Sequence, residues 1–312
     1  RVLWQSISAL QKRYSFVKCV VYTGYENNTS AKQILQKVQK NFCINLKEPV
    51  EFVYLRCRVC VEPRCWPRFT IIGQSIGSVI LGLEALFKFS PHFFIDTTGH
   101  SFVVPVFRWL GGCKTASYVH FPTVSLDMIE RVRSSESSYN NSNRISQSKL
   151  LTNLKLIYYW LYAKLYGFAG RRNNVVMVNS TWTHGHISKL WGTWRNIYII
   201  FPPCDTLSFQ QLPLHRTGGK FRIVSIGQFR PEKDHKLQLT ILQAFLRKLS
   251  SQEAKCVELV LIGSCRNKED KDRVIELRRL AKSLHIEDNI RFEIGISFQK
   301  LKEEVAAAIA AL

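Results

Sequence analysis

The strongest constraint on the fold of this chain is a regular alternation of short apolar runs with longer amphipathic runs. Helix-like segments such as Ala31–Lys40, Ser75–Phe89 and Ser148–Tyr166 separate the short runs. Strands that alternate with helices in this way predict parallel sheets with helices on both faces. Six short runs are rich in β-branched or aromatic residues, as is typical of buried strands: Val17–Tyr22, Glu51–Leu55, Phe93–Asp96, Ala116–Val119, Val175–Asn179 and Ile197–Phe201.

A stretch with Pro and Gly, from Pro202 to Gly219, interrupts this alternation, which then restarts. Phe221–Ile226, Val257–Ile262 and Ile290–Ile294 are predicted strands with helical periodicity between them, a βαβαβ unit. We therefore expect an α/β protein with two Rossmann-like, doubly wound domains that face each other across a ligand cleft. The expected domains are residues 1–203 and 220–312, with a connector at 204–219. Because only three strands are predicted in the second domain, we expect it to be truncated.

The charge of the chain predicts an anionic partner. Its 312 residues include 44 Lys and Arg and 23 Asp and Glu, a formal net charge of +21. Residues 220–312 hold 18 basic and 13 acidic side chains, so residues 1–219 hold 26 and 10 and carry most of the excess. Nucleic acid, phospholipid or a phosphorylated substrate would suit such a surface. A hydrophobic fraction of 46% excludes a disordered chain.

The nine cysteines favour a reducing, cytosol-facing environment over a disulfide framework, because nine is an odd number and the chain is long enough to fold without disulfides. Cys57 and Cys60 have the spacing of zinc ligands, with Cys65 nearby. No second pair follows at zinc-finger distance, so we expect no metal site there. His184 with His186, and Asp270 with Asp272, also lack further ligands of the right kind, and we expect no metal at either.

The segment Ile71–Phe89 comes closest to the length of a membrane span, but Gln74 and Glu84 interrupt it. We expect a buried helix there. A second segment, Leu154–Phe168, combines aromatic residues with two lysines. That composition suits either a membrane interface or an internal core helix. In the interface interpretation, the contacting side chains would be Tyr158, Tyr159, Trp160 and Tyr162.

Two loops after predicted strands of the second half carry glycine and basic residues. Gly227 is followed by Arg230 and Lys233 at the start of a predicted helix, and Gly263 is followed by Arg266. Two cations beside a helix N-terminus can bind a diphosphate, although a solvated helix start has the same appearance. The repetition of the arrangement at the next strand favours an anionic nucleotide.

A histidine, His120, directly follows the predicted strand Ala116–Val119. Ligands of doubly wound sheets bind at the carboxyl ends of strands, so His120 is a candidate catalytic residue at the floor of the expected cleft. A purely structural histidine is the alternative.

Several segments resemble a known enzyme family. In chain order they are His120–Met128, Val176–Thr183, Pro202–Asp205, Ser225–Lys233 and Leu261–Lys268. Together they resemble the eukaryotic α-1,2-mannosyltransferases of asparagine-linked glycan assembly, which are GT-B glycosyltransferases. The resemblance implies a retaining, metal-independent mannosyltransferase that uses GDP-mannose and a dolichol-pyrophosphate-linked oligosaccharide, at the cytosolic face of the endoplasmic reticulum membrane.

The resemblance also implies roles for individual residues. Arg230 and Lys233, with Arg266, would hold the GDP diphosphate, and His120 would lie against the transferred mannose. Gly227 and Gly263 would let the backbone approach the nucleotide. Many relatives have an arginine directly after the first glycine, where this chain has Gln228. The family's glycine-rich loop and membrane anchor would precede Arg1 and its Glu-x7-Glu motif would follow Leu312, so residues 1–312 alone are expected to be inactive.

Three other functions stay open at the level of sequence. A related GT-B transferase could use another sugar nucleotide, since no residue here identifies mannose by itself. A non-catalytic, membrane-associated fragment could keep the same fold. A nucleic-acid binder would fit the charge, but no recognised module is present, and we expect no nucleic-acid partner. The membrane surface is an expected partner, and contacts with other mannosyltransferases of the pathway are left open.

Overall fold

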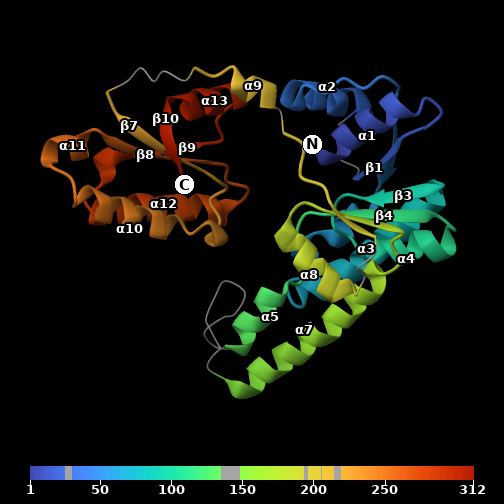
Figure 1. Cartoon of the computed structure of the whole chain (residues 1–312). Coiled ribbons are helices and arrows are strands. Elements are labelled where there is room, and N and C mark those ends of the chain that lie inside the picture. The colour runs from blue at the N-terminus through green and yellow to red at the C-terminus, as the bar shows by residue number, and fades with distance from the viewer. Residues whose placement is uncertain (25–29, 135–147, 193–195, 205, 214–218) are drawn as a thin grey trace. The chain divides into compact units, whose positions relative to one another are not determined.

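The chain divides into two compact units, Arg1–Cys204 and Asp205–Leu312, within the expected α/β class (Figure 1). The structure is a computed structural model, and it describes residues 1–24, 30–134, 148–192, 196–204, 206–213 and 219–312.

The first unit contains all six strands predicted from its sequence, and every pairing between them is parallel, as expected. They form two sheets, one with the order β1-β2 and one with the order β3-β4-β5-β6. The strands are β1 (Val20–Gly24), β2 (Glu51–Leu55), β3 (Phe93–Asp96), β4 (Lys114–Val119), β5 (Val175–Val178) and β6 (Ile197–Ile199). The helices are α1 (Val2–Arg13), α2 (Ala31–Phe42), η1 (Cys57–Val61), η2 (Pro63–Cys65), α3 (Thr70–Lys88), α4 (Val103–Pro105), η3 (Val106–Leu110), α5 (Leu126–Arg133), α7 (Lys149–Gly170) and α8 (Thr181–Trp191).

The local sequence explains where several helices begin. Ser30 accepts a hydrogen bond from the backbone N–H of Gln33, and the Gln33 side chain accepts one from the N–H of Ser30, so this capping box starts α2. Ser180 caps α8 by accepting a hydrogen bond from the backbone N–H of Thr183. These caps satisfy backbone donors that have no partner within the helix.

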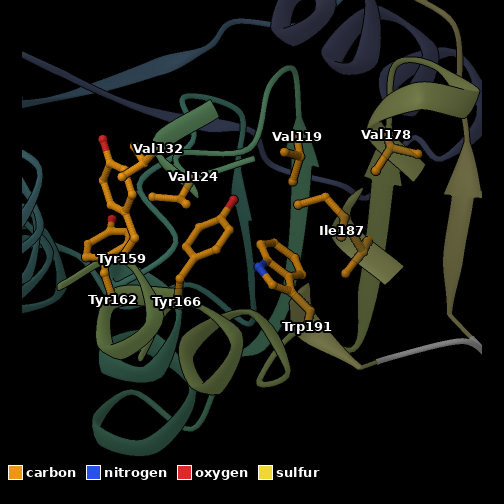
Figure 2. Packing of buried hydrophobic residues seen from close by; sticks show 10 residues of the cluster. Val119, Val124, Val132, Tyr159, Tyr162, Tyr166, Val178, Ile187 and Trp191 are labelled. Atoms are coloured by element: carbon orange, nitrogen blue, oxygen red, sulfur yellow. The ribbon is translucent and has the colours of Figure 1, made fainter. Parts of the chain in front are cut away.

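The largest core cluster of the first unit is built from α7 and α8 against β4 and β5 (Figure 2). Trp191 is fully buried, and its ring meets that of Tyr166 edge-on at a centroid distance of 5.4 Å. Tyr159 and Tyr162 lie in the same cluster, only 4% and 2% exposed. The prediction that these two tyrosines contact a membrane is therefore wrong, because both are buried in this cluster, and the Tyr162 hydroxyl lies 3.0 Å from that of Ser75 in α3.

The prediction of a buried helix over Ile71–Phe89 is also wrong for one face. Helix α3 buries its small residues, such as Gly77 and Ala85. However, only 28% of its most apolar 18-residue stretch is buried. Ile76 is 50% exposed and Phe87 is 87% exposed. Among the described residues, α3 is the one helix that is long and apolar enough to cross a membrane.

The second unit is a four-stranded parallel sheet with the order β10-β7-β8-β9. The sequence predicted three of these strands. The fourth strand pairs with β7, so the expectation that this sheet stops after three strands is corrected. The strands are β7 (Phe221–Ile226), β8 (Val257–Gly263), β9 (Ile290–Ile294) and β10 (Ala308–Ala311). The helices are α9 (Thr206–Gln210), η4 (Pro231–Lys233), α10 (His235–Leu246), α11 (Ser251–Lys255), α12 (Lys268–Ser283), η5 (Glu287–Asn289) and α13 (Phe298–Ala307).

Strand β8 is buried on both faces, which explains its continuous apolar sequence. Leu259 and Leu261 pack in a cluster with α10 and α12. Val260 and Ile262 point to the other face and pack in a second cluster with Ala308 of β10. Burial on both faces fixes the position of β8, and with it the loop that follows its carboxyl end.

We predict that Trp191→Ala destabilises the first unit by about 3–5 kcal/mol, because it leaves a large cavity in a fully buried position. Trp160→Ala is the matched control, since this side chain is 58% exposed, and it should change stability by less than about 0.5 kcal/mol. Urea unfolding followed by the remaining tryptophans measures both, because all seven tryptophans precede residue 205. Equal losses in the two variants would contradict this account of the core.

Candidate functional site

The carboxyl ends of β7 and β8 bring two glycine loops of the second unit together. The N–H of Gly227 donates to the carbonyl of Ile262 at 2.9 Å. A Cβ atom on Gly263 would lie 2.0 Å from the carbonyl oxygen of Gly227, so no larger residue fits without moving the backbone. Glycine at 263 is therefore required by the neighbouring loop itself.

Arg230 and Lys233 follow in the first of these loops, where the sequence predicted a diphosphate site. The aliphatic carbons of Lys233 lie over Gly227, 3.4 Å from the position that a Cβ would take there. The described part of the chain offers the Lys233 ammonium no ion pair. Arg230 has one weak contact, 3.4 Å from its Nη1 to Glu232, and its Nε is buried without a hydrogen-bond partner. Both cations therefore keep charge and donors for a ligand.

A buried carboxylate, Asp270, organises the second loop. It is 3% exposed and accepts hydrogen bonds from the backbone N–H of Arg266 at 3.0 Å and from Arg266 Nε at 3.3 Å. Its other oxygen lies 3.7 Å from Arg273 Nη1, which also donates to the carbonyl of Phe229 in the first loop. The N–H of Arg266, together with both guanidinium groups, lowers the pKa of Asp270. Asp270 thus stays charged and joins the two loops through its arginines.

A buried histidine, which the sequence analysis did not predict as a site residue, follows Arg230 and Lys233 in the chain. His235, at the start of α10, is 3% exposed and stacks on the ring of Phe229 at a centroid distance of 5.0 Å. Burial lowers the pKa of His235, and Arg273 and Lys233 lower it further. Its ring is therefore neutral near pH 7.

Unpaired buried atoms gather at this place. Among the described residues, His235 Nδ1, Gln238 Oε1 and Arg230 Nε are three of six buried side-chain nitrogen and oxygen atoms without a hydrogen-bond partner. Buried polar atoms are almost always paired, so a cluster of exceptions marks a position that water or a ligand completes. No sequence signal predicts this cluster, since pairing depends on neighbours distant in the chain.

In the first unit, His120 lies exposed directly after β4, at the carboxyl edge of its sheet. The Tyr118 ring contacts it edge-on at a centroid distance of 4.9 Å. The next residue, Phe121, is 59% exposed and stacks on Trp182 of α8 at 4.9 Å. The sequence predicted His120 as a candidate but not this aromatic pair, because Trp182 is 61 residues from Phe121 in the chain.

His186 has a structural position. Its Nδ1 accepts a hydrogen bond from the N–H of Leu126 at 3.2 Å, and its Nε2 lies 3.5 Å from Asp127.

All nine cysteines are free thiols. Within the described ranges, no three His, Cys, Asp or Glu side chains are grouped so as to hold a metal ion.

The aromatic helix α7 carries the remaining predicted residues. Trp160 is 58% exposed, and the ammonium of Lys164 lies over its ring at 5.5 Å. Tyr158 is half-buried and contacts the exposed Phe69. Apolar residues line the rest of this face of α7, each more than half exposed: Leu150, Leu154, Ile157, Leu161 and Leu165.

Comparison with known proteins connects this geometry to one family. The profile of the ALG11 mannosyltransferase N-terminus matches residues 1–191. The GDP-Man:Man(3)GlcNAc(2)-PP-Dol alpha-1,2-mannosyltransferase of Xenopus laevis is 45% identical over 310 residues, which are 99% of this chain and 63% of that protein. The protein of the same name from Homo sapiens is 44% identical, with 99% of this chain and 63% of its own length covered. The chain thus spans less than two thirds of these relatives.

The similarity to solved structures shows the fold. The UDP-forming alpha,alpha-trehalose-phosphate synthase of Burkholderia xenovorans aligns with a TM-score of 0.59 at 10% identity, over 94% of this chain and 82% of that one. It is a GT-B glycosyltransferase, and the two doubly wound units of this chain are of the same class, as the sequence predicted.

We predict that His235→Asn flattens the pH dependence of the stability of the second unit. The histidine has a lowered pKa in the fold, so the unfolded chain binds more protons below its ordinary pKa, and stability falls as the pH drops through about 6.5. Hydrogen exchange of β8 peptides at pH 7.5 and 5.5 measures how much stability the second unit loses between these two pH values. His285→Asn, at an exposed position of the same unit, is the control. Its stability should depend on pH as steeply as that of the wild type. An unchanged slope in His235→Asn would contradict the assignment.

Proposed function

Because the chain belongs to the ALG11 mannosyltransferase family, we propose that it is part of a retaining α-1,2-mannosyltransferase. Its donor would be GDP-mannose, and its acceptor a dolichol-pyrophosphate-linked oligosaccharide of N-glycan precursor assembly. The relatives' shared name, the GT-B fold and the basic loops of the second unit all support this function.

The observation that carries the proposal is the set of cations at the carboxyl ends of β7 and β8. Lys233 lacks an ion pair with any described residue, and the terminal nitrogens of Arg230 are almost unused. Arg266 offers its outer guanidinium nitrogens, since Asp270 takes only its Nε. Together with the N-terminus of α10, these groups would bind the GDP diphosphate.

The same cations would promote the reaction. The bond between the mannose anomeric carbon and the diphosphate oxygen breaks as the acceptor hydroxyl oxygen bonds to that carbon from the same face. Negative charge then develops on the departing diphosphate, which takes up the hydroxyl proton. Preorganised Arg and Lys side chains stabilise that charge, so we expect neither a metal ion nor another cofactor.

The residues around His120 would bind the sugar that is transferred. His120 is exposed at a sheet edge where doubly wound folds bind ligands, and we assign it to the transferred mannose. The exposed stacked pair of Phe121 and Trp182 beside it offers an apolar surface that suits the C–H face of a sugar ring.

We further propose that the first unit binds the cytosolic face of the endoplasmic reticulum membrane, where a dolichol-linked acceptor is embedded. The exposed apolar side chains of α7, including Ile157, Trp160 and Leu161, would enter the interface. The basic excess of residues 1–219 would attract anionic headgroups. In this revised surface, Tyr159 and Tyr162 support α7 from the core rather than contact lipid.

We predict that Lys233→Ala in the full-length protein weakens GDP-mannose binding by about 1.5–3 kcal/mol, the usual contribution of a charge-assisted hydrogen bond. Arg230→Ala should weaken it as well. Lys236→Ala is the matched control, because this nearby lysine already pairs with Glu276 at 3.6 Å. Titration calorimetry decides between the outcomes. Wild-type affinity in both Lys233→Ala and Arg230→Ala would remove these residues from the donor site.

For the membrane surface, we predict that the double variant Ile157→Ser, Trp160→Ser lowers flotation with anionic vesicles several-fold without unfolding the first unit. Both side chains are more than half exposed, so their loss should leave the core intact. Phe16→Ser, 84% exposed and outside both α3 and α7, is a control for loss of a single apolar side chain elsewhere. Equal flotation of the double variant and the wild type, at low and high salt, would exclude this face of α7.

A further inference from the structure

Two long stretches of the first unit contain no acidic residue. Residues 97–126 and 148–204 include basic residues but neither Asp nor Glu. Within the part of the chain that the structure describes, Arg108, Lys114 and Arg172 form no ion pair with any residue. A basic surface without local carboxylates attracts a partner that supplies the negative charge.

These three basic residues lie at the amino ends of neighbouring strands. Lys114 is the first residue of β4. Arg172 precedes β5 by three residues, and its carbonyl accepts a hydrogen bond from the Thr115 hydroxyl at 2.9 Å. Arg108 of η3 reaches the same edge, where its Nη1 donates to Asn174 Oδ1 at 2.7 Å. The sheet therefore brings together cations that are distant in the chain.

Hydrogen bonds to β4 hold the turn that carries Arg172. The Asn174 N–H donates to the carbonyl of Thr115 at 2.8 Å, and Asn174 Oδ1 accepts from the N–H of Thr115 at 2.9 Å. The hydroxyl of Ser117 donates to Asn173 Oδ1 at 2.9 Å. The backbone of this turn is thus fixed before any ligand binds, which lowers the ordering cost of binding.

The guanidinium of Arg172 lies against two aromatic rings. Its Cζ is 5.0 Å from the ring centroid of Trp109 and 4.6 Å from that of Phe168, and the two rings are 5.6 Å apart. Trp109 is 54% exposed and Phe168 is 42% exposed. The Nε of Arg172 is buried without a hydrogen-bond partner among the described residues. The rings orient the guanidinium through cation–π contacts, and its donors remain for a ligand.

This aromatic pair continues the exposed apolar face of α7. Leu161, Leu165 and Phe168 follow one another at spacings of four and three residues, so they lie on one side of the helix. Leu110, next to Trp109, is 69% exposed. The apolar face that we propose for membrane contact therefore ends at a group of cations and exposed aromatic rings. Aromatic and basic side chains of this kind are enriched at the level of lipid headgroups.

We propose that Arg172, with Arg108 and Lys114, binds the phosphate of an anionic phospholipid headgroup. The site rests on the membrane surface proposed above for α7, and it places one headgroup at the end of that surface. The planar guanidinium of Arg172 can donate two parallel hydrogen bonds to a phosphate. Trp109 and Phe168 would lie between the headgroups and the acyl chains.

The headgroup site is separate from the residues that we assign to the transferred sugar. His120 follows the other end of β4, six residues after Lys114, which is roughly 20 Å at the rise of a strand. The proposed acceptor carries an oligosaccharide between its diphosphate and the sugar that is extended, so its lipid end and its reacting end can lie at different edges. The headgroup site would thus orient the first unit on the membrane.

Photocrosslinking of the full-length protein identifies the bound lipid. Leu110 is replaced by p-benzoylphenylalanine, and the vesicles contain phosphatidylcholine with a minor share of phosphatidylserine. Mass spectrometry of the adducts should show phosphatidylserine enriched roughly fivefold over its share of the vesicle. The crosslink forms without GDP-mannose. Its failure therefore leaves the proposed transfer reaction standing, and failure of the transfer reaction leaves this site standing.

Three variants separate a site from general attraction. Arg172→Met keeps an unbranched side chain over the two rings and removes the charge, so it should lower the enrichment about threefold. Lys149→Met is the matched control, because it removes the same charge from the opposite end of α7, and it should leave the enrichment unchanged. Lys114→Met alters an exposed side chain outside the aromatic pair, so the fold should tolerate it, and it should lower the enrichment about twofold.

Four results would overturn the assignment. Adducts that contain the two lipids in proportion to their abundance would show an apolar contact without a headgroup site. Equal losses of enrichment in Arg172→Met and Lys149→Met would assign the effect to the general charge of the surface. Adducts mainly with dolichol diphosphate, in vesicles that also contain this lipid, would identify the acceptor as the occupant. Adducts with protein alone would identify a partner protein.

Discussion

The second unit of this protein depends on the parallel pairing of β7 with β8. The pairing places Ile226 opposite Ile262, and a glycine follows each of these two residues. The two loops then touch through their backbones, since the carbonyl of Gly227 occupies the space beside Gly263. Because β8 is buried on both faces, this edge is rigid, and the basic residues of both loops are held over it.

Charge is distributed unequally over that edge. Asp270 engages Arg266 and Arg273, which fixes the second loop and joins it to the first through the carbonyl of Phe229. Arg230 and Lys233 have no comparable partner among the residues that the structure describes. A carboxylate that holds two arginines in place, beside two cations that are not held, is suited to a ligand that brings its own negative charge.

The first unit differs in that its core is divided. The aromatic cluster of α7 and α8 gives β4 and β5 a fully packed face, which positions His120 and the Phe121–Trp182 pair at the strand ends. The two-stranded β1-β2 sheet packs separately, and a cavity lies between it and β3.

The sequence alone determined nine of the ten described strands, their parallel direction, the two-unit organisation of the α/β class and the basic loops. Apolar periodicity and turn residues are local properties of the sequence, so they can be recognised without a structure. For example, Phe221–Ile226 and Ile290–Ile294 were predicted with their observed bounds. Only the tertiary structure decided which side of a helix is buried. In α7 the composition is apolar almost all round, so nothing local separates Tyr159, in the core, from Trp160, which is exposed. The strand β10, the Asp270 bridge and the unpaired atoms around His235 also depend on residues that are distant in the chain and meet only once the sheet has formed.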